Sequence, residues 1–228
     1  MIEFIKKISL KSEFIIVITI AFGYSIFSSL IIFLTGSSYS NNSNAFFTNA
    51  NLLSTVFYDI IIMTILYEFL HIRESLIELK NNLSSLKLLF SSLLLVLIFY
   101  FIYYLLVFIV FKILPHTQPI NFTQITINQN LNISVIITIS IVNSIFEETI
   151  VVGYIISKLR DKKGVFFAIN VSILVRFLYH LYQGPMAALS IIPLGILFAF
   201  VYVKWKNIWP LIIAHIILDI LGLYLTGL

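Results

Sequence analysis

The sequence has no cysteine and very few charged residues. Of its 228 residues, 11% are charged and 60% are hydrophobic. The lack of cysteine excludes disulfide bonds and thiolate metal sites. A soluble domain of this length would carry about 25% charged residues, so the deficit indicates a polytopic membrane protein. The mean hydropathy of +1.05 agrees with that class.

The sequence also lacks a clustered basic surface and any sign of domain division. The net charge is only +4, the basic residues do not gather on one polar face, and the many aromatic residues lie in apolar runs. These features exclude nucleic acid as a partner. We find no internal repeat and no linker long enough to separate domains. We therefore expect residues 1–228 to form a single membrane domain in contact with lipids.

Seven apolar segments have the length of a membrane span, about 17–26 residues each. They cover roughly residues 13–35, 52–70, 88–112, 132–157, 165–183, 187–203 and 208–226. The first follows Lys6, Lys7 and Lys11, which resemble the start of a signal peptide. Its apolar run from Phe14 to Leu34 exceeds the roughly 7–15 residues of such a signal, so we expect this span to be retained. The predicted fold is an all-α membrane helix bundle.

The basic residues alternate between the two sides of this seven-span arrangement. Twelve of the 14 fall on one side, in four groups: Lys6, Lys7 and Lys11; Arg73, Lys80 and Lys87; Lys158, Arg160, Lys162 and Lys163; and Lys204 and Lys206. Loops rich in lysine and arginine face the cytoplasm. The N-terminus is therefore predicted to be cytoplasmic and the C-terminus to lie outside.

The polar segment 72–87 is not a span. Its apolar residues Ile72, Leu76, Leu79 and Leu83 recur at helical spacing between charged residues. This pattern is typical of an amphipathic helix lying on the inner membrane surface. A solvated connector is an equally good interpretation.

Two adjacent carboxylates, Glu147 and Glu148, lie inside the apolar run from Ile133 to Ile156. A single acid at the centre of a span costs roughly 2.5–3.5 kcal/mol on insertion scales. Consecutive residues of a helix diverge by about 100°, so both cannot face one small site symmetrically. One can point into a cavity while the other bonds to a neighbouring helix. A pair satisfied by inter-helical hydrogen bonds, without chemistry, is the alternative.

Two later spans carry candidate partners, each pair separated by four residues and hence on one helical face. The fifth span holds Arg176 and His180, and the seventh holds His215 and Asp219. An arginine cannot be neutralised by deprotonation, so a buried Arg176 requires a carboxylate. An aspartate one turn from a histidine can accept its N–H, although a self-satisfied polar pair is again possible.

These carboxylates and histidines suit two chemistries. They could bind a divalent metal such as zinc, which would activate a water molecule. Alternatively, a glutamate with a histidine could activate water directly, while His215 and Asp219 donate hydrogen bonds to the oxyanion. Both lead to hydrolysis of an amide bond within the membrane.

The same residues form three motifs in order. These are Glu147-Glu148 followed by Gly153, then Arg176 to His180, then His215-Ile-Ile-Leu-Asp219. Over residues 132–226, the motif-bearing catalytic core, the pattern resembles the CPBP family. These are the CaaX protease and bacteriocin-processing (Abi) membrane proteins, related to the type II CaaX prenyl endopeptidase.

The resemblance implies an intramembrane endopeptidase with defined roles for these residues. Glu147 would be the water-activating base, His180 its partner, and His215 with Asp219 the oxyanion stabilisers. Glu148 would be supporting. The family is described both as metal-free and as metal-dependent, so the implied cofactor is none or a divalent metal such as zinc. The metal ligands would then be Glu147, His180 and His215.

Two positions depart from the family pattern. Val152 stands where the first motif has arginine, and Arg176 stands where the second motif usually has phenylalanine. The family arginine is thought to pair with a glutamate and hold it ionised. We therefore predict that Arg176 supplies this positive charge from the neighbouring helix.

The expected substrate is a membrane-associated peptide or protein. Bacterial relatives are linked to processing of leader or signalling peptides and to self-immunity against bacteriocins. The Ile, Asn and Lys-rich composition is typical of an AT-rich Gram-positive bacterium, which places the chain in the cytoplasmic membrane and disfavours a prenylated substrate. Two other functions are open: a catalytically impaired scaffold or regulator, for which Val152 is the main support, and a transporter or ion pathway using the buried charges.

Overall fold

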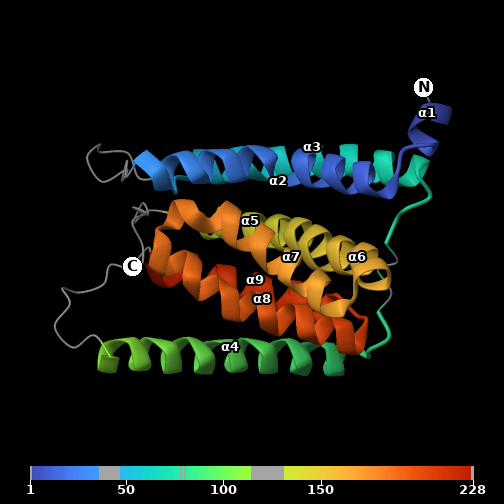
Figure 1. The fold of residues 1–228 in the computed structure, drawn as a ribbon. Coiled ribbons are helices and arrows are strands. Elements are labelled where there is room, and N and C mark those ends of the chain that lie inside the picture. Colours follow the sequence, from blue (N-terminus) through green and yellow to red (C-terminus); the bar gives the residue numbers. More distant parts are fainter. Residues whose placement is uncertain (1, 36–46, 78, 80, 114–130, 227–228) are drawn as a thin grey trace.

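The chain folds into helices. The structure is a computed structural model that describes residues 2–35, 47–77, 79, 81–113 and 131–226 (Figure 1). Within those ranges the helices are α1 (Ile2–Lys6), α2 (Leu10–Thr35), α3 (Asn49–Ile72), α4 (Ser85–Ile113), α5 (Ile133–Glu147), the π-helix η2 (Glu148–Tyr154), α6 (Ile155–Lys163), α7 (Val165–His180), the 3₁₀ turn η3 (Leu181–Gln183), α8 (Pro185–Trp205) and α9 (Trp209–Thr226). No strand occurs in these ranges, so the predicted all-α class is confirmed.

The predicted spans match the helices to within a few residues. In the described chain six helical segments are long and apolar enough to cross a membrane, and a shorter apolar helix, Trp209–Leu225, follows them. One of the six is continuous from Ile133 to Lys163, because α5, η2 and α6 follow one another without a break. The chain is thus a multi-pass membrane protein, as the sequence predicted.

The helices lie in three layers (Figure 1). Helices α2 and α3 lie side by side on one face, α4 lies alone on the opposite face, and the helices from α5 to α9 fill the space between them. In the layer of α2 and α3, α3 packs on α5 and α2 packs on α7. On the opposite face, α4 packs on α8 and α9. The middle layer therefore has protein on both faces, which suits polar side chains that must avoid lipid.

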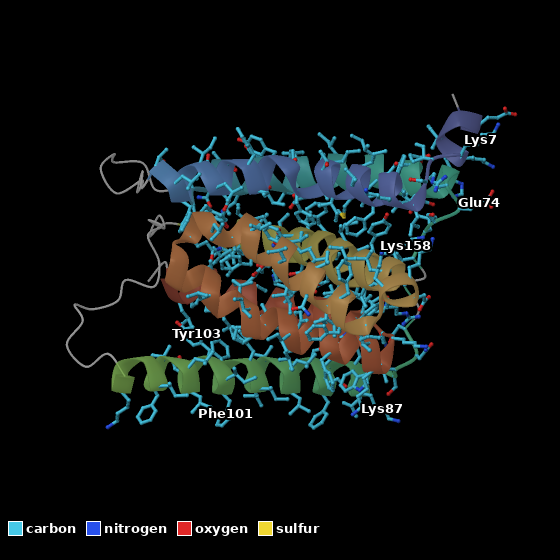
Figure 2. The ribbon with its side chains drawn as sticks, in the orientation of Figure 1. Lys7, Glu74, Lys87, Phe101, Tyr103 and Lys158 are labelled. Carbon is cyan, nitrogen blue, oxygen red and sulfur yellow. The ribbon has the colours of Figure 1, made fainter. Side chains whose placement is uncertain are left out.

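The alternation of basic residues is visible in the arrangement of the helices. Lys7, Lys87 and Lys158 all lie at the same end of the bundle, which is also where α1 lies (Figure 2). Lys112 belongs to the last turn of α4, which ends at the other side. Assignment of the basic end to the cytoplasm rests on the positive-inside rule.

Two glycines close the turns on either side of α7. Gly164 has φ of 87° and Gly184 has φ of 95°. A residue with a β-carbon adopts these angles only with strain, whereas glycine does so freely. Each glycine lets the chain reverse within one residue, so α6, α7 and α8 pack as neighbours.

The predicted amphipathic helix over 72–87 is wrong. In this segment α3 ends at Ile72, α4 begins at Ser85, and the described residues between them are not helical. The indole N–H of Trp209 donates to the carbonyl of Leu79 at 3.1 Å, using an acceptor that a helix would have used itself. The segment is a connector across one end of the bundle.

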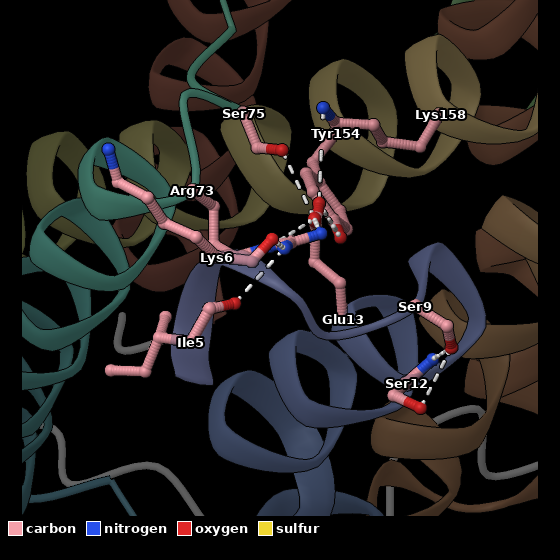
Figure 3. Close-up of polar contacts among 9 residues, drawn as sticks. All are labelled: Ile5, Lys6, Ser9, Ser12, Glu13, Arg73, Ser75, Tyr154 and Lys158. Atoms are coloured by element: carbon pink, nitrogen blue, oxygen red, sulfur yellow. Dashed lines mark hydrogen bonds and ion pairs between the residues drawn. The ribbon is translucent and has the colours of Figure 1, made fainter. Parts of the chain in front are cut away.

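A buried ionic cluster around Glu13 fastens α2 to this connector and to the middle layer (Figure 3). Glu13 is fully buried. Arg73 donates to its Oε2 from Nε at 2.9 Å and from Nη2 at 2.8 Å, and Ser75 Oγ donates to the same oxygen at 3.1 Å. The hydroxyl of Tyr154 donates to Oε1 at 3.1 Å, and Lys158 Nζ lies 3.9 Å from it. Sequence analysis gave no indication of this cluster.

We expect Glu13→Gln to destabilise the protein strongly. Removal of one member of a buried ion pair leaves the other charge uncompensated, which costs about 3–5 kcal/mol. The matched control is Glu74→Gln, because the ion pair of Glu74 with Lys6 lies at the surface (3.3 Å, side chains 81% and 52% exposed) and should contribute little. Thermal unfolding in detergent would measure both variants. Equal midpoints for the two would contradict the assigned role of Glu13.

Candidate active site

The two glutamates stand where the central helix changes its winding. Glu147 is the last residue of α5 and Glu148 the first of the π-helix η2. The Glu147 side chain is almost fully buried and that of Glu148 is completely buried. A π-helical segment inside a longer helix is rare and occurs frequently at functional sites. The sequence gave no sign of this change, since the run was predicted as one regular span.

Arg176 is the cation that holds both glutamates. Its Nη2 donates to Glu148 Oε1 at 2.7 Å, and its Nη1 lies 3.5 Å from Glu147 Oε2. The side chain is only 1% exposed, and its guanidinium lies 6.0 Å from the centre of the Phe198 ring. The predicted contact from the neighbouring helix is therefore confirmed. A single guanidinium reaches both carboxylates, so the two acids share one counter-ion.

Val152 lies in the apolar core, as its side chain requires. It is fully buried and packs in a cluster with residues of α8 and α9, among them Phe198 and Leu211. The position that carries arginine in the family thus contributes packing here. Positive charge comes from α7 instead.

Glu147 differs from Glu148 in how its oxygens are used. Tyr179 donates its hydroxyl to Glu147 Oε2 at 2.6 Å, the same oxygen that faces Arg176. Within the described chain no hydrogen bond reaches Oε1 of Glu147. In Glu148 the same oxygen, Oε1, accepts from both Arg176 and His215, and the buried Oε2 has no hydrogen-bond partner in the described chain. The Glu147 side chain is 8% exposed and that of Glu148 is 0% exposed, so Glu147 is the glutamate that a water molecule or substrate can approach.

His180 is held in one tautomer by the backbone of its own helix. Its Nδ1 lies 2.8 Å from the carbonyl oxygen of Arg176, which can only accept, so Nδ1 carries the hydrogen. In a neutral ring Nε2 then has a lone pair. No direct hydrogen bond joins His180 to Glu147 in the described chain. Instead, the Tyr179 ring, 4.5 Å from the imidazole between centres, lies against His180 while its hydroxyl binds Glu147.

His215 lies between two carboxylates. Its Nδ1 is 2.6 Å from Glu148 Oε1, and its Nε2 is 3.4 Å from Asp219 Oδ1. The other oxygen of Asp219 accepts a hydrogen bond from Asn143 Nδ2 at 3.4 Å. Glu148 therefore fixes the orientation of the ring, and the longer contact on Nε2 is the one that a substrate oxygen can replace.

The residues present were compared with the needs of a metal ion. Among the described residues, ligand atoms of Glu147, Glu148 and His215 lie within 4.8 Å of one another. This differs from the predicted ligand set, because Glu148 takes the place of His180. Arg176 already pairs with both carboxylates. A metal-bound imidazole must offer a nitrogen lone pair to the metal, whereas both ring nitrogens of His215 face carboxylate oxygens here. In this structure the positive charge beside the two glutamates is thus that of Arg176.

The N-terminal helices form one wall of the site. The ring of Phe22 in α2 stacks on Tyr179 with centres 4.7 Å apart and also contacts Phe146 at 5.3 Å. The backbone N–H of Tyr182 donates to Ser29 Oγ of α2 at 2.7 Å. The position of the Tyr179 hydroxyl, and hence of Glu147, depends on this packing.

Sequence analysis missed several residues of the site. Tyr179, Phe22 and Asn143 carry no charge, and nothing in their local sequence distinguishes them from other core residues. Asp59 of α3 could have been found, because it is an acid within an apolar run, the signal that identified the glutamates. It is 3% exposed, and its Oδ2 has no hydrogen-bond partner in the described chain.

Residues 129–221 match the family model described as type II CAAX prenyl endopeptidase Rce1-like. Over these residues, which we call the Rce1-like segment, the chain is similar to that family. The Rce1-like segment includes all the residues predicted for the site: Glu147, Glu148, Arg176, His180, His215 and Asp219. Searches of curated proteins and of solved structures gave no match.

The Rce1-like segment covers less than half of the chain and begins just before α5. Helices α1 to α4 lie outside it. Phe22, Ser29 and Asp59, which line or approach the site, are therefore contributed by a part of the chain to which the family match does not extend.

Proposed function

We propose that the chain is an intramembrane endopeptidase that hydrolyses a peptide bond of a membrane-associated peptide or protein. The observation that carries the proposal is the division of labour between the adjacent glutamates. Glu148 is completely buried and fixed through Oε1 by Arg176 and His215, whereas Glu147 is 8% exposed and accepts a hydrogen bond only from Tyr179 in the described chain. A general base must be within hydrogen-bond reach of the water that it activates, and the partly exposed Glu147 meets this need better than the completely buried Glu148. The Rce1-like family agrees with this reaction class.

In the proposed reaction Glu147 Oε1 accepts a proton from a water molecule that His180 Nε2 helps to hold. The water oxygen forms a bond to the carbonyl carbon of the substrate, and the carbonyl π electrons move to its oxygen. The C–N bond then breaks as the leaving nitrogen takes the proton from Glu147. The products are a carboxylic acid and an amine, and Glu147 is restored as a carboxylate.

The oxyanion of the intermediate would accept a hydrogen bond from His215 Nε2. Asp219 and Glu148 orient that ring from its two sides. An ionised aspartate has no hydrogen to donate, so we assign Asp219 to supporting His215 and not to contacting the oxyanion itself. Removal of one oxyanion donor costs about 10²–10³-fold in turnover in other enzymes. No metal takes part in this scheme.

The proposed setting is a bacterial cytoplasmic membrane, in a Gram-positive organism, with the basic end of the bundle inside. Leader or signalling peptides and peptides of bacteriocin immunity are the substrate classes that this setting offers. A prenylated CaaX substrate is not part of this proposal.

Purified protein in lipid vesicles, incubated with a broad panel of membrane-associated peptides and analysed by mass spectrometry, tests the proposal. We expect cleavage that persists in the presence of a strong metal chelator and falls at least 10²-fold in His180→Ala, because a partner of the base is lost. Cleavage abolished by the chelator and restored by zinc would contradict the metal-free scheme. No cleavage of any peptide by the unmutated protein would favour the alternative function of a membrane scaffold.

A further inference from the structure

Asp59 is a buried carboxylate to which the proposed reaction assigns no role. It lies near the middle of α3, within an apolar helix, and is 3% exposed. Its Oδ2 has no hydrogen-bond partner among the described residues. An unpartnered buried polar group lowers stability, and an ionisable residue inside a membrane span is by default functional.

The packing of α3 on α5 places Asp59 close to the glutamates. The two helices start together, where the backbone N–H of Asn132 donates to Asn49 Oδ1 at 2.9 Å. They then run in the same direction, and Leu52 and Val56 of α3 pack in one cluster with residues of α5: Val135, Ile139 and Val142. Continuing this register puts Asp59 level with Val142 and Asn143.

Asn143 precedes Glu147 by one helical turn, or about 6 Å along the axis. At the level of Asp59, Asn143 donates to Asp219 of α9. Polar side chains from α3, α5 and α9 thus lie at the same height along the helix axes, about one turn from the proposed general base Glu147.

A substrate peptide that enters this site brings unpaired N–H groups. To be cleaved it must be extended locally, and within a membrane its backbone cannot use water to satisfy those groups. In soluble proteases and peptide receptors a strand edge commonly supplies the acceptors. The described part of this chain has no strand, so an unpartnered side-chain oxygen such as Asp59 Oδ2 is an available acceptor.

We propose that Asp59 is a substrate-binding residue, whose free carboxylate oxygen accepts a hydrogen bond from a backbone N–H of the peptide next to the scissile bond. This inference rests on the proposed function, and it deepens it by giving the N-terminal helices a part in binding the substrate. It also accounts for the location of an unpaired acid at a position where a leucine would pack without cost.

Two measurements on Asp59→Leu test the inference, with Glu68→Gln, an exposed acid of the same helix, as the control. We expect thermal unfolding of Asp59→Leu to occur at least about 2 °C higher than in the unmutated protein, because a buried unpaired carboxylate is removed. We expect KM for a cleaved peptide to rise tenfold or more, with a smaller change in kcat. The control should change neither quantity.

Peptides N-methylated at single positions around the scissile bond identify the hydrogen bond. One such methyl group should weaken binding to an inactive Glu147→Gln protein tenfold or more, and the same methyl group should have little effect once Asp59→Leu is added. A lower unfolding temperature with unchanged KM would show that Asp59 is structural and overturn the inference. A fall in kcat alone would show that Asp59 holds the water and not the peptide, and would also overturn it. Absence of both binding and cleavage by the unmutated protein would instead remove the proposed function.

Discussion

Replacing Arg176 with methionine is expected to abolish peptide cleavage and to lower the stability of the protein by about 3–5 kcal/mol. Both effects have one cause. Arg176 is 1% exposed and is the shared counter-ion of Glu147 and Glu148, so its loss leaves two carboxylates buried without a guanidinium. At least one of them must then take up a proton, and a protonated glutamate no longer acts as a base. Thermal unfolding and the peptide assay would be measured on the same preparation.

Arg176→Lys is the matched control for charge. Lysine retains the positive charge but has a single nitrogen in place of the fork that reaches both glutamates, so we expect an intermediate loss of both activity and stability. If Arg176→Met keeps full activity, Arg176 does not perform the task assigned to it, and cleavage requires no arginine at position 152 or at position 176.

A double substitution tests whether an arginine at position 152 can replace the arginine at position 176. Val152→Arg combined with Arg176→Phe recreates the family arrangement, with the arginine on the glutamate helix and the phenylalanine on α7. We expect it to recover part of the activity that Arg176→Phe alone loses. Val152→Arg alone should be harmful, because a second cation would be inserted into a fully buried apolar position. Equal inactivity of the single and double variants would show that the two positions are not equivalent.

Much of the architecture could be predicted because membrane spans obey simple rules of length and apolarity. The seven spans and the alternation of basic groups follow from local composition alone. The contact of Arg176 with the glutamates could also be predicted, since a buried arginine requires a carboxylate and Glu147 and Glu148 offered the nearest ones. The inference needed only charge and burial, without any knowledge of geometry.

The remaining features depend on partners that are distant in the sequence. Glu13 is stabilised by Arg73 and Tyr154, and no local pattern connects these three residues. The segment 72–87 has apolar residues at helical spacing, which is only a weak preference for a helix. Its backbone instead accepts a hydrogen bond from Trp209 of α9, and this tertiary contact outweighs the local preference. The π-helix from Glu148 to Tyr154 has no known signature in composition.

The geometry also corrected the expected pairing within the site. His180 was predicted as the direct partner of Glu147, yet Tyr179 donates to that glutamate while the His180 imidazole donates to a backbone carbonyl. Arg176, Tyr179 and His180 lie within about one turn of α7. All three side chains are therefore close enough to the facing helix to meet Glu147. The sequence identified the correct turn of α7, but it could not show which of its side chains meets the carboxylate.

The two glutamates should respond differently to the same substitution. Glu147→Gln is expected to lower kcat/KM by about 10²–10⁴-fold, the usual contribution of a general base, because an amide cannot accept the proton of water. Its effect on stability should be small, since the glutamine oxygen can still accept from Tyr179 and the side chain keeps its shape.

Glu148→Gln, in contrast, is expected to reduce stability and activity together. Glu148 is completely buried and receives hydrogen bonds from Arg176 and His215, so the neutral amide leaves two donors without a charged acceptor. Unfolding temperatures and cleavage rates of the two variants, measured side by side, show which glutamate is the general base and which one supports the structure of the site. If Glu148→Gln is inactive at unchanged stability while Glu147→Gln still cleaves, the roles of the two glutamates are exchanged. In that case the fully buried carboxylate is the one that activates water, and the water molecule would have to reach its unpartnered Oε2.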